Sequence, residues 1–318
     1  MKKGLQHVVM AGLLLALASP SFAWFKFFSD SSYAKTRYPI VLAHGMAGFD
    51  KIGLLDYWYG IPDDLGSRGA KVYLTQVSSF QSSEVRGEQL LAQVQDILAI
   101  TGASKVNLIG HSHGNQSIRY VAAALPGRVA SVTSVGGPTK GSPVADLIED
   151  ASLAVGDDIT QGIGSIVDGF GALIGLAAGE ELPQDILGGL ASLTTAGAAD
   201  FNARFPAGVP TSACGEGAHV VDNIRFYSWG GTGQVTNLLD PVDLPILANS
   251  ASFIGTEDNQ NDGFVGRCSN HLGKVIRDNY NMNHLDEVNQ VIGLTALFET
   301  NPVVVFRSHA NRLKKAGL

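Results

Sequence analysis

The chain has 318 residues, of which 45% are hydrophobic and only 16% are charged. This composition allows a sizeable buried core, arranged as one large α/β domain or two smaller domains. The formal charge is −7 and no basic tract is present. Both facts argue against a nucleic-acid partner.

The first 23 residues have the pattern of a secretory signal peptide. Lys2 and Lys3 form a positive start, residues 8–18 an apolar stretch, and Ser21-Phe22-Ala23 a small-residue cleavage site. The apolar stretch is too short for a comfortable membrane span. We expect cleavage after Ala23 and a mature chain, residues 24–318, with a formal charge of −9 and no transmembrane segment. The protein is then secreted through the periplasm to the extracellular medium.

The next elements of the chain alternate between strand and helix patterns. After a loosely held arm at 24–28, residues 38–43, 71–77, 106–109 and 129–135 are expected strands. A helix is expected from Ser82 or Ser83 to Ile100, ended by Gly102, with an inner face of Val85, Leu90, Leu91, Val94, Ile97 and Leu98. Strands alternating with helices predict a mostly parallel central sheet with helices on both faces.

Residues 139–193 break this alternation. Their centre places apolar side chains at helical spacing between Ile159 and Ile174, but six glycines between Gly162 and Gly179 weaken that helix. A buried core helix is one interpretation. We favour a mobile helical lid, at about 146–184, whose apolar face meets lipid when it opens.

The C-terminal part begins with a strand at 225–229 and becomes rich in loops. Residues 285–298 are expected to form a helix. Acidic residues gather in the loops, namely Asp240, Asp243, Glu257, Asp258 and Asp262.

Gly110-His-Ser-His-Gly114 lies between an expected strand and an expected helix at 115–124. That context suits a nucleophile elbow, in which a strained turn projects the hydroxyl of Ser112. An ordinary glycine-rich turn is the alternative. A serine needs a base and a group that orients the base, and in this fold the order is serine, acid, histidine.

Four histidines follow the serine: His219, His271, His284 and His309. His284 lies in a polar stretch before the expected helix and is our candidate base, with His271 as its rival. Asp262 is the candidate acid, although a plain Asp-Gly turn would also explain it. Asp262→Ala should lose less activity than substitution of Ser112 or His284 if Asp258 or Glu257 can take the place of Asp262.

An EF-hand calcium loop starting at Asp258 is ruled out by spacing, since its twelfth position is Ser269 rather than glutamate. The tetrahedral intermediate formed by an attacking serine needs two backbone N–H donors. His113, which follows the nucleophile, and Met46, in the turn after the first strand, are the candidates. The only two cysteines, Cys214 and Cys268, should form one disulfide after export, with two buried thiols as the alternative.

With these residues assembled, the chain from about Tyr38 onward resembles the secreted bacterial triacylglycerol lipases of the pseudomonad type, which are α/β-hydrolases. The resemblance lies in six ordered segments: 38–46, 83–91, 106–114, 211–217, 271–280 and 283–290. Asn115 stands where many members have glycine. The segments 24–28 and 146–184 match least well.

The resemblance implies a role for each candidate residue. Ser112 is the nucleophile, Asp262 the acid and His284 the base, while Met46 and His113 form the oxyanion hole. It also implies the Cys214–Cys268 disulfide. A structural Ca²⁺ is implied too, held by the side chains of Asp240 and Asp286 and by the carbonyls of Gln290 and Leu294. A dedicated foldase and the type II secretion machinery are implied partners.

The sequence thus predicts a lipase that cleaves long-chain triacylglycerols at a lipid–water interface through an acyl-enzyme. A carboxylesterase or polyester depolymerase is the nearest alternative. A non-catalytic lipid-binding protein that kept the hydrolase fold is the alternative from another class.

Overall fold

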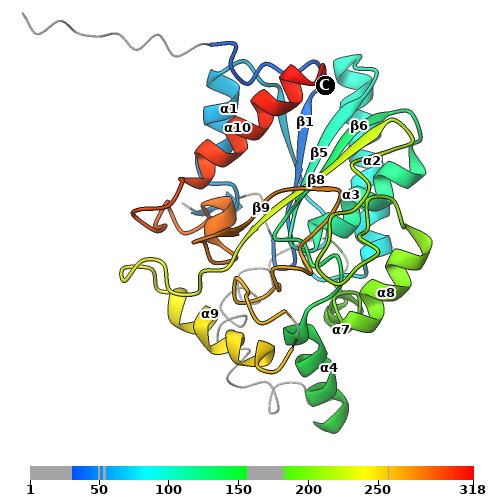
Figure 1. Cartoon of the computed structure of the whole chain (residues 1–318). Coiled ribbons are helices and arrows are strands. Elements are labelled where there is room, and N and C mark those ends of the chain that lie inside the picture. The colour runs from blue at the N-terminus through cyan, green and yellow to red at the C-terminus, as the bar shows by residue number, and fades with distance from the viewer. Residues whose placement is uncertain (1–30, 49–50, 53–54, 156–181, 183, 257) are drawn as a thin grey trace, which may run out of the picture.

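The computed structural model describes residues 31–48, 51–52, 55–155, 182, 184–256 and 258–318 (Figure 1). The signal peptide, the arm at 24–28 and the centre of the expected lid lie outside these residues. Among the described residues, no helix is both long and apolar enough to span a membrane.

A mostly parallel seven-stranded sheet forms the centre of the molecule. The strand order is β4-β1-β5-β6-β8-β7, and β9 also pairs with β8. Only the β7–β8 pairing is antiparallel. The strands are β1 (Ile40–Ala43), β4 (Val72–Thr75), β5 (Val106–His111), β6 (Val129–Val135), β7 (Val220–Val221), β8 (Ile224–Gly231) and β9 (Lys274–Tyr280). This confirms the predicted α/β-hydrolase architecture.

Helices cover both faces of the sheet, as predicted (Figure 1). On one face Leu42 and Ile109 pack with α1 (Ile61–Ser67) and α10 (Pro302–Lys315). On the other, Val41 and Leu108 pack with α2 (Ser83–Thr101) and α3 (Gly114–Ala124). β1, β5 and β6 are buried along their whole length, as expected of parallel strands covered on both faces.

The predicted caps of α2 are present. Ser82 accepts a hydrogen bond from the backbone N–H of Val85, and Gly102 ends the helix with a φ of 64°. The predicted inner face was partly wrong, because Val85 is exposed and Leu91 only half-buried. Arg86 and Gly87 are buried instead. A Cβ at Gly87 would lie 2.4 Å from the ring of Tyr120 on α3, so glycine permits this close packing.

Further elements connect the strands along the chain or follow β9. They are α4 (Pro143–Val155), α7 (Ile186–Ala191), α8 (Thr195–Arg204), α9 (Asp243–Asn249), the 3-10 helices η1 (Ser250–Phe253) and η2 (Asp286–Val288), and the antiparallel pair β2 (Lys51–Ile52) and β3 (Leu55–Asp56). The helix predicted for 285–298 was wrong, since only η2 forms there. Asn289 ends it in a left-handed conformation, with a φ of 61°, and its side chain donates to the carbonyl of Tyr59.

Candidate active site

Ser112 occupies a strained turn between β5 and α3. Its φ is 54°, in the left-handed region that non-glycine residues rarely adopt, and its backbone N–H donates to the carbonyl of Val135 at 2.9 Å. A Cβ at Gly110 would lie 2.4 Å from the carbonyl oxygen of Gly114, and one at Gly114 would lie 2.4 Å from that of Ala43. The two glycines are therefore required where strand, turn and helix pass each other. The strand–turn–helix context expected of a nucleophile elbow is present.

Asp262 and His284 form a buried pair. His284 Nδ1 lies 2.7 Å from Asp262 Oδ2, and the backbone N–H of His284 donates to the carbonyl of Asp262. The other carboxylate oxygen, Oδ1, accepts from the backbone N–H groups of Phe264 and Val265. One oxygen therefore builds the Asp-Gly turn while the other orients the imidazole. The turn and the functional interpretation of Asp262 are compatible.

Ser112 and His284 line the same cavity, although they are far apart in the sequence. The cavity walls are mainly apolar, with contributions from α4, the α7 segment and the loop after Asp262. These wall residues include Val144, Ala145, Ile148, Leu190, Leu193 and Phe264. The site therefore offers a hydroxyl and an imidazole at the base of an apolar space.

The rival histidines have other partners. His271 bonds the carbonyl of Gly215 and the carboxylate of Asp278, and His309 bonds the hydroxyl of Thr133. His219 packs edge-on against Tyr227. None of the three lines the cavity that contains Ser112. Of the four histidines that follow Ser112 in the sequence, only His284 combines a carboxylate partner with that cavity.

The turn after β1 is held by the buried side chain of Arg86. Its Nη2 donates to the carbonyls of His44, at 2.8 Å, and Gly45, at 3.0 Å, and its Nη1 donates to those of Ser78 and Ser79. Arg86 was not among the residues predicted from the sequence to support the site. A charged residue on a helix usually faces solvent, so the helix pattern gave no reason to expect a buried arginine. The only sequence signal for a role was that Arg86 lies in the family-like segment 83–91.

The backbone N–H groups of Met46 and His113 are the two predicted oxyanion donors. Within the described part of the chain, the backbone N–H groups of Met46 and His113 donate to no protein acceptor. Met46 lines the cavity. His113 is the N-cap of α3, and the N–H groups at the start of a helix lack partners within the helix. Its imidazole Nε2 lies 2.9 Å from the hydroxyl of Ser83.

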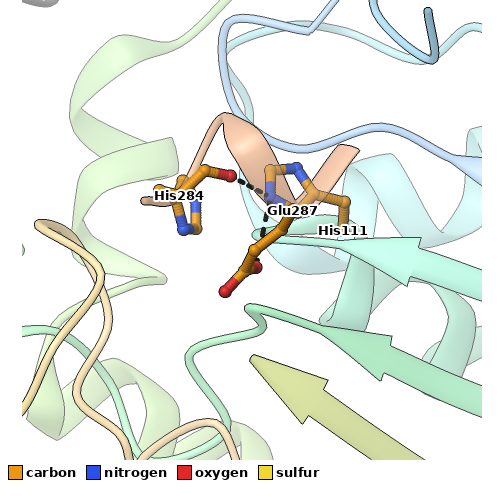
Figure 2. Close-up of side chains that lie close together, drawn as sticks. All are labelled: His111, His284 and Glu287. Carbon is orange, nitrogen blue, oxygen red and sulfur yellow. Dashed lines mark hydrogen bonds and ion pairs between the residues drawn. The ribbon is translucent and has the colours of Figure 1, made fainter. Parts of the chain in front are cut away.

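Three buried side chains, His111, His284 and Glu287, come together beside the cavity (Figure 2). Each offers a nitrogen or oxygen atom within 4.8 Å of the others, so the group could hold a metal ion. His111 Nε2 lies 3.0 Å from the carbonyl oxygen of His284 and 3.8 Å from Glu287 Oε2. Burial, followed by the charge of Asp262, raises the pKa of Glu287 well above its ordinary value.

Buried acceptor oxygens gather in the loops on either side of His284. Asp240 Oδ2, Asp286 Oδ1 and Gln290 Oε1 are buried and have no hydrogen-bond partner among the described residues. Burial raises the pKa of Asp240 to about 6 and that of Asp286 to about 7, and neighbouring carboxylates add to both shifts. Oxygen donors of this kind suit a hard cation such as Ca²⁺.

The predicted disulfide between Cys214 and Cys268 is present, with the two Cα atoms 4.6 Å apart. It joins the loop before β7 to the segment that follows Asp262. The carboxylate of Asp258 accepts from the backbone N–H groups of Cys268 and Ser269. The carboxylate of Asp258 is therefore engaged in this loop. Glu257 lies outside the described residues.

A serine on an elbow of a mostly parallel sheet, with an acid–histidine pair on later loops, defines the α/β-hydrolase class. The sequence profile of the alpha/beta hydrolase fold matches residues 38–288, and the chain belongs to that family.

Among individual proteins, a triacylglycerol lipase of Vibrio cholerae is 54% identical over 297 residues, covering 91% of this chain and 92% of that protein. A triacylglycerol lipase of Burkholderia plantarii is 42% identical, covering 97% of this chain and 93% of that protein. The resemblance inferred from the motifs is confirmed. A solved Staphylococcus hyicus lipase shares the fold, with a TM-score of 0.60 and 18% identity over 89% of this chain and 97% of that one.

Proposed function

We propose that this protein is a secreted lipase that hydrolyses long-chain triacylglycerols through a Ser112–His284–Asp262 triad. The observation that carries the proposal is one cavity lined by a strained serine and by a histidine whose Nδ1 lies 2.7 Å from a buried carboxylate. That arrangement activates a serine toward acyl transfer.

The reaction follows from the proton positions. Asp262 accepts the Nδ1–H of His284, which leaves Nε2 as the basic nitrogen. His284 takes the hydroxyl proton as Ser112 Oγ attacks the ester carbonyl, and returns it to the alcohol oxygen as the C–O bond breaks. Water then attacks the acyl-enzyme by the same route and releases the fatty acid.

The negative charge that develops on the carbonyl oxygen is stabilised by the N–H groups of Met46 and His113. Both are free of protein acceptors among the described residues. Arg86 supports this role, since it holds the carbonyls of His44 and Gly45 and so fixes the peptide plane that carries the Met46 N–H. Preorganised donors contribute because they need no reorientation during the reaction.

Several exposed apolar side chains support a lipid–water interface as the partner. Leu147 on α4 and Leu187 on α7 are exposed near the cavity. A second set lies on α9, on the loop before it and on the loop after Thr295, and a hydrogen bond from the Asn237 side chain to the carbonyl of Thr295 joins the two loops. We call this set the loop patch: Leu238, Leu239, Leu244, Leu297 and Phe298, each more than 70% exposed. Such exposure is unusual on a protein that meets only water.

We propose a structural Ca²⁺ bound by the side chains of Asp240 and Asp286 and by the carbonyls of Gln290 and Leu294. The orphaned oxygens of Asp240 and Asp286 fit this cation. It would supply charge compensation rather than chemistry. Asp286 lies two residues after His284, so its fixed position would in turn hold the histidine loop. The group of His111, His284 and Glu287 suits catalysis better, because both nitrogens of His111 and the Nδ1 of His284 already have partners.

We also propose secretion through the periplasm, with the signal peptide removed after Ala23. The disulfide supports an oxidising destination. A dedicated foldase and the type II machinery remain proposed partners on the basis of the family resemblance.

The test compares the refolded mature chain with Ser112→Ala on emulsified triolein and on p-nitrophenyl acetate. We expect hydrolysis of the emulsion at the higher rate, and loss of nearly all turnover in the variant. A preference for the soluble ester would instead indicate an esterase. Failure of a fluorophosphonate to label Ser112 would indicate a lipid-binding protein without catalysis.

A further inference from the structure

A buried chain of hydrogen bonds runs from the oxyanion turn to the candidate base. The backbone N–H of Gly45 donates to the hydroxyl oxygen of Tyr57 at 2.9 Å. That oxygen lies 2.5 Å from His111 Nδ1, and His111 Nε2 lies 3.0 Å from the carbonyl oxygen of His284. Tyr57 and His111 are 3% and 1% exposed, so water does not compete for these bonds.

When the His111 ring is neutral, one arrangement of protons satisfies every link. A carbonyl oxygen can only accept, so His111 Nε2 must carry a proton and donate to His284. A neutral imidazole then has its lone pair on Nδ1, which must accept from the Tyr57 hydroxyl. The Tyr57 oxygen keeps a lone pair for the N–H of Gly45. Burial, followed by the neighbouring His284, lowers the pKa of His111 well below its ordinary value, in agreement with a neutral ring.

We infer that Tyr57 and His111 are a positioning pair that holds the oxyanion turn and the catalytic histidine in one fixed relation. This inference rests on the proposed triad. Both side chains line the cavity of Ser112 and His284, and the role inferred for each is to position backbone groups. Tyr57 fixes the N–H of Gly45, one residue before the oxyanion donor Met46. His111 fixes the backbone of His284, and its ring also packs on the His284 ring with centroids 4.6 Å apart.

The geometry around Ser112 shows why this relation matters. A Cβ at Gly45 would lie 2.5 Å from Ser112 Cβ, 2.9 Å from the Tyr57 hydroxyl and 3.1 Å from Ser112 Oγ. The nucleophile, the turn and the Tyr57 hydroxyl therefore converge at one point. A small shift of the turn against His284 would misalign the attacking oxygen and the oxyanion donor together, which lowers kcat more than substrate affinity.

Tyr57→Phe is the direct test, since it keeps the ring contacts with Trp58 and His111 and removes only the hydroxyl. Two hydrogen bonds of ordinary net strength are lost, so we expect kcat on p-nitrophenyl butyrate to fall about 5- to 10-fold, with KM changed less than about twofold. Rates are divided by the number of serines that a fluorophosphonate labels, so unfolded protein does not count. Tyr59→Phe, at an exposed neighbouring tyrosine, is the matched control and should leave kcat unchanged.

Two further measurements separate positioning from general stability. In a double-mutant cycle, Tyr57→Phe and His111→Asn together should reduce kcat less than the product of their separate effects, because both substitutions break the same chain of hydrogen bonds. Nitrogen-15 NMR of the wild-type protein should find His111 neutral, with its proton on Nε2. Multiplicative losses, a proton on Nδ1, or a Tyr57→Phe variant with wild-type kcat would each overturn the inference. Activity in Ser112→Ala would instead overturn the proposed triad.

Discussion

Arg86 provides the sharpest test of how the oxyanion turn is maintained. Its guanidinium is fully buried and donates to four backbone carbonyls, two in the turn after β1 and two in the segment of Ser78 and Ser79. In Arg86→Met a side chain of similar length loses every donor. The turn then keeps its sequence but loses the group that aligns the Met46 N–H.

The magnitude follows from these contacts. Hydrogen bonds from a charged donor contribute about 1.5–3 kcal/mol each. Removing the buried charge recovers several kcal/mol of desolvation free energy, so we expect a net loss of about 2–4 kcal/mol in the free energy of unfolding. Loss of one oxyanion donor typically lowers kcat by about 10²–10³-fold, and a misaligned Met46 N–H should approach the lower value.

The assay measures kcat on p-nitrophenyl butyrate per labelled serine, together with the melting temperature. Arg119→Met is the matched control, because Arg119 is also buried but donates to Asn202 and the carbonyl of Phe205, away from the turn. Both variants should have a lower melting temperature than the wild-type protein, but only in Arg86→Met should kcat fall about 100-fold. The kcat of Arg86→Lys should lie between that of the wild-type protein and that of Arg86→Met. Equal kcat in the two arginine variants would refute the role assigned to Arg86.

Four other substitutions or conditions test separate parts of the account. Asp262→Asn should keep measurable activity, because the carboxyl group of Glu287 lies close to that of Asp262 beside His284. Adding Glu287→Gln to Asp262→Asn should remove that remaining activity. Equal activity in the single and the double variant would contradict this. A chelator should lower both melting temperature and activity, and Asp240→Asn should abolish that sensitivity, whereas unchanged melting would exclude the cation. Burial alone would raise the pKa of Asp64, but hydrogen bonds from two arginines lower it. Its carboxylate therefore stabilises the fold above about pH 4, and that contribution is lost as the pH falls further. Urea titrations at pH 6 and pH 3 give the free energy of unfolding at each pH. In Asp64→Asn the difference between the two values should shrink by up to about 1 kcal/mol. Phe298→Ser in the loop patch, made in the inactive Ser112→Ala protein, should weaken binding to triolein emulsions. The same substitution in an otherwise wild-type chain should leave turnover of p-nitrophenyl butyrate unchanged. Unchanged emulsion binding would show that the loop patch does not contact the lipid interface.

The features predicted well from sequence are those decided by neighbouring residues. The strand of Val106, the glycines that flank Ser112 and the caps of α2 each depend on a few adjacent positions. A buried parallel strand is apolar on both faces and therefore conspicuous in the sequence. The paired cysteines were equally conspicuous, since only one pairing was available.

The features that sequence analysis missed are decided by distant parts of the chain. The helix expected at 285–298 fails because Asn289 turns the backbone to reach the carbonyl of Tyr59. Strand β9 was not predicted, since Lys274–Tyr280 is a partly exposed edge strand with few apolar residues. Arg86 looked like a solvent-facing charge because the carbonyls that it binds lie in other elements. Such tertiary contacts override local propensity.

The central claim is that the Ser112 hydroxyl, activated by His284, attacks the ester of an apolar substrate. The most direct measurement is mass spectrometry of the fluorophosphonate-treated protein, combined with turnover of emulsified triolein by the same sample. We predict one phosphonyl group on Ser112, complete loss of turnover after labelling, and at least about 10³-fold slower labelling in His284→Ala. Labelling at another serine, or turnover that persists after Ser112 is fully modified, would contradict the claim.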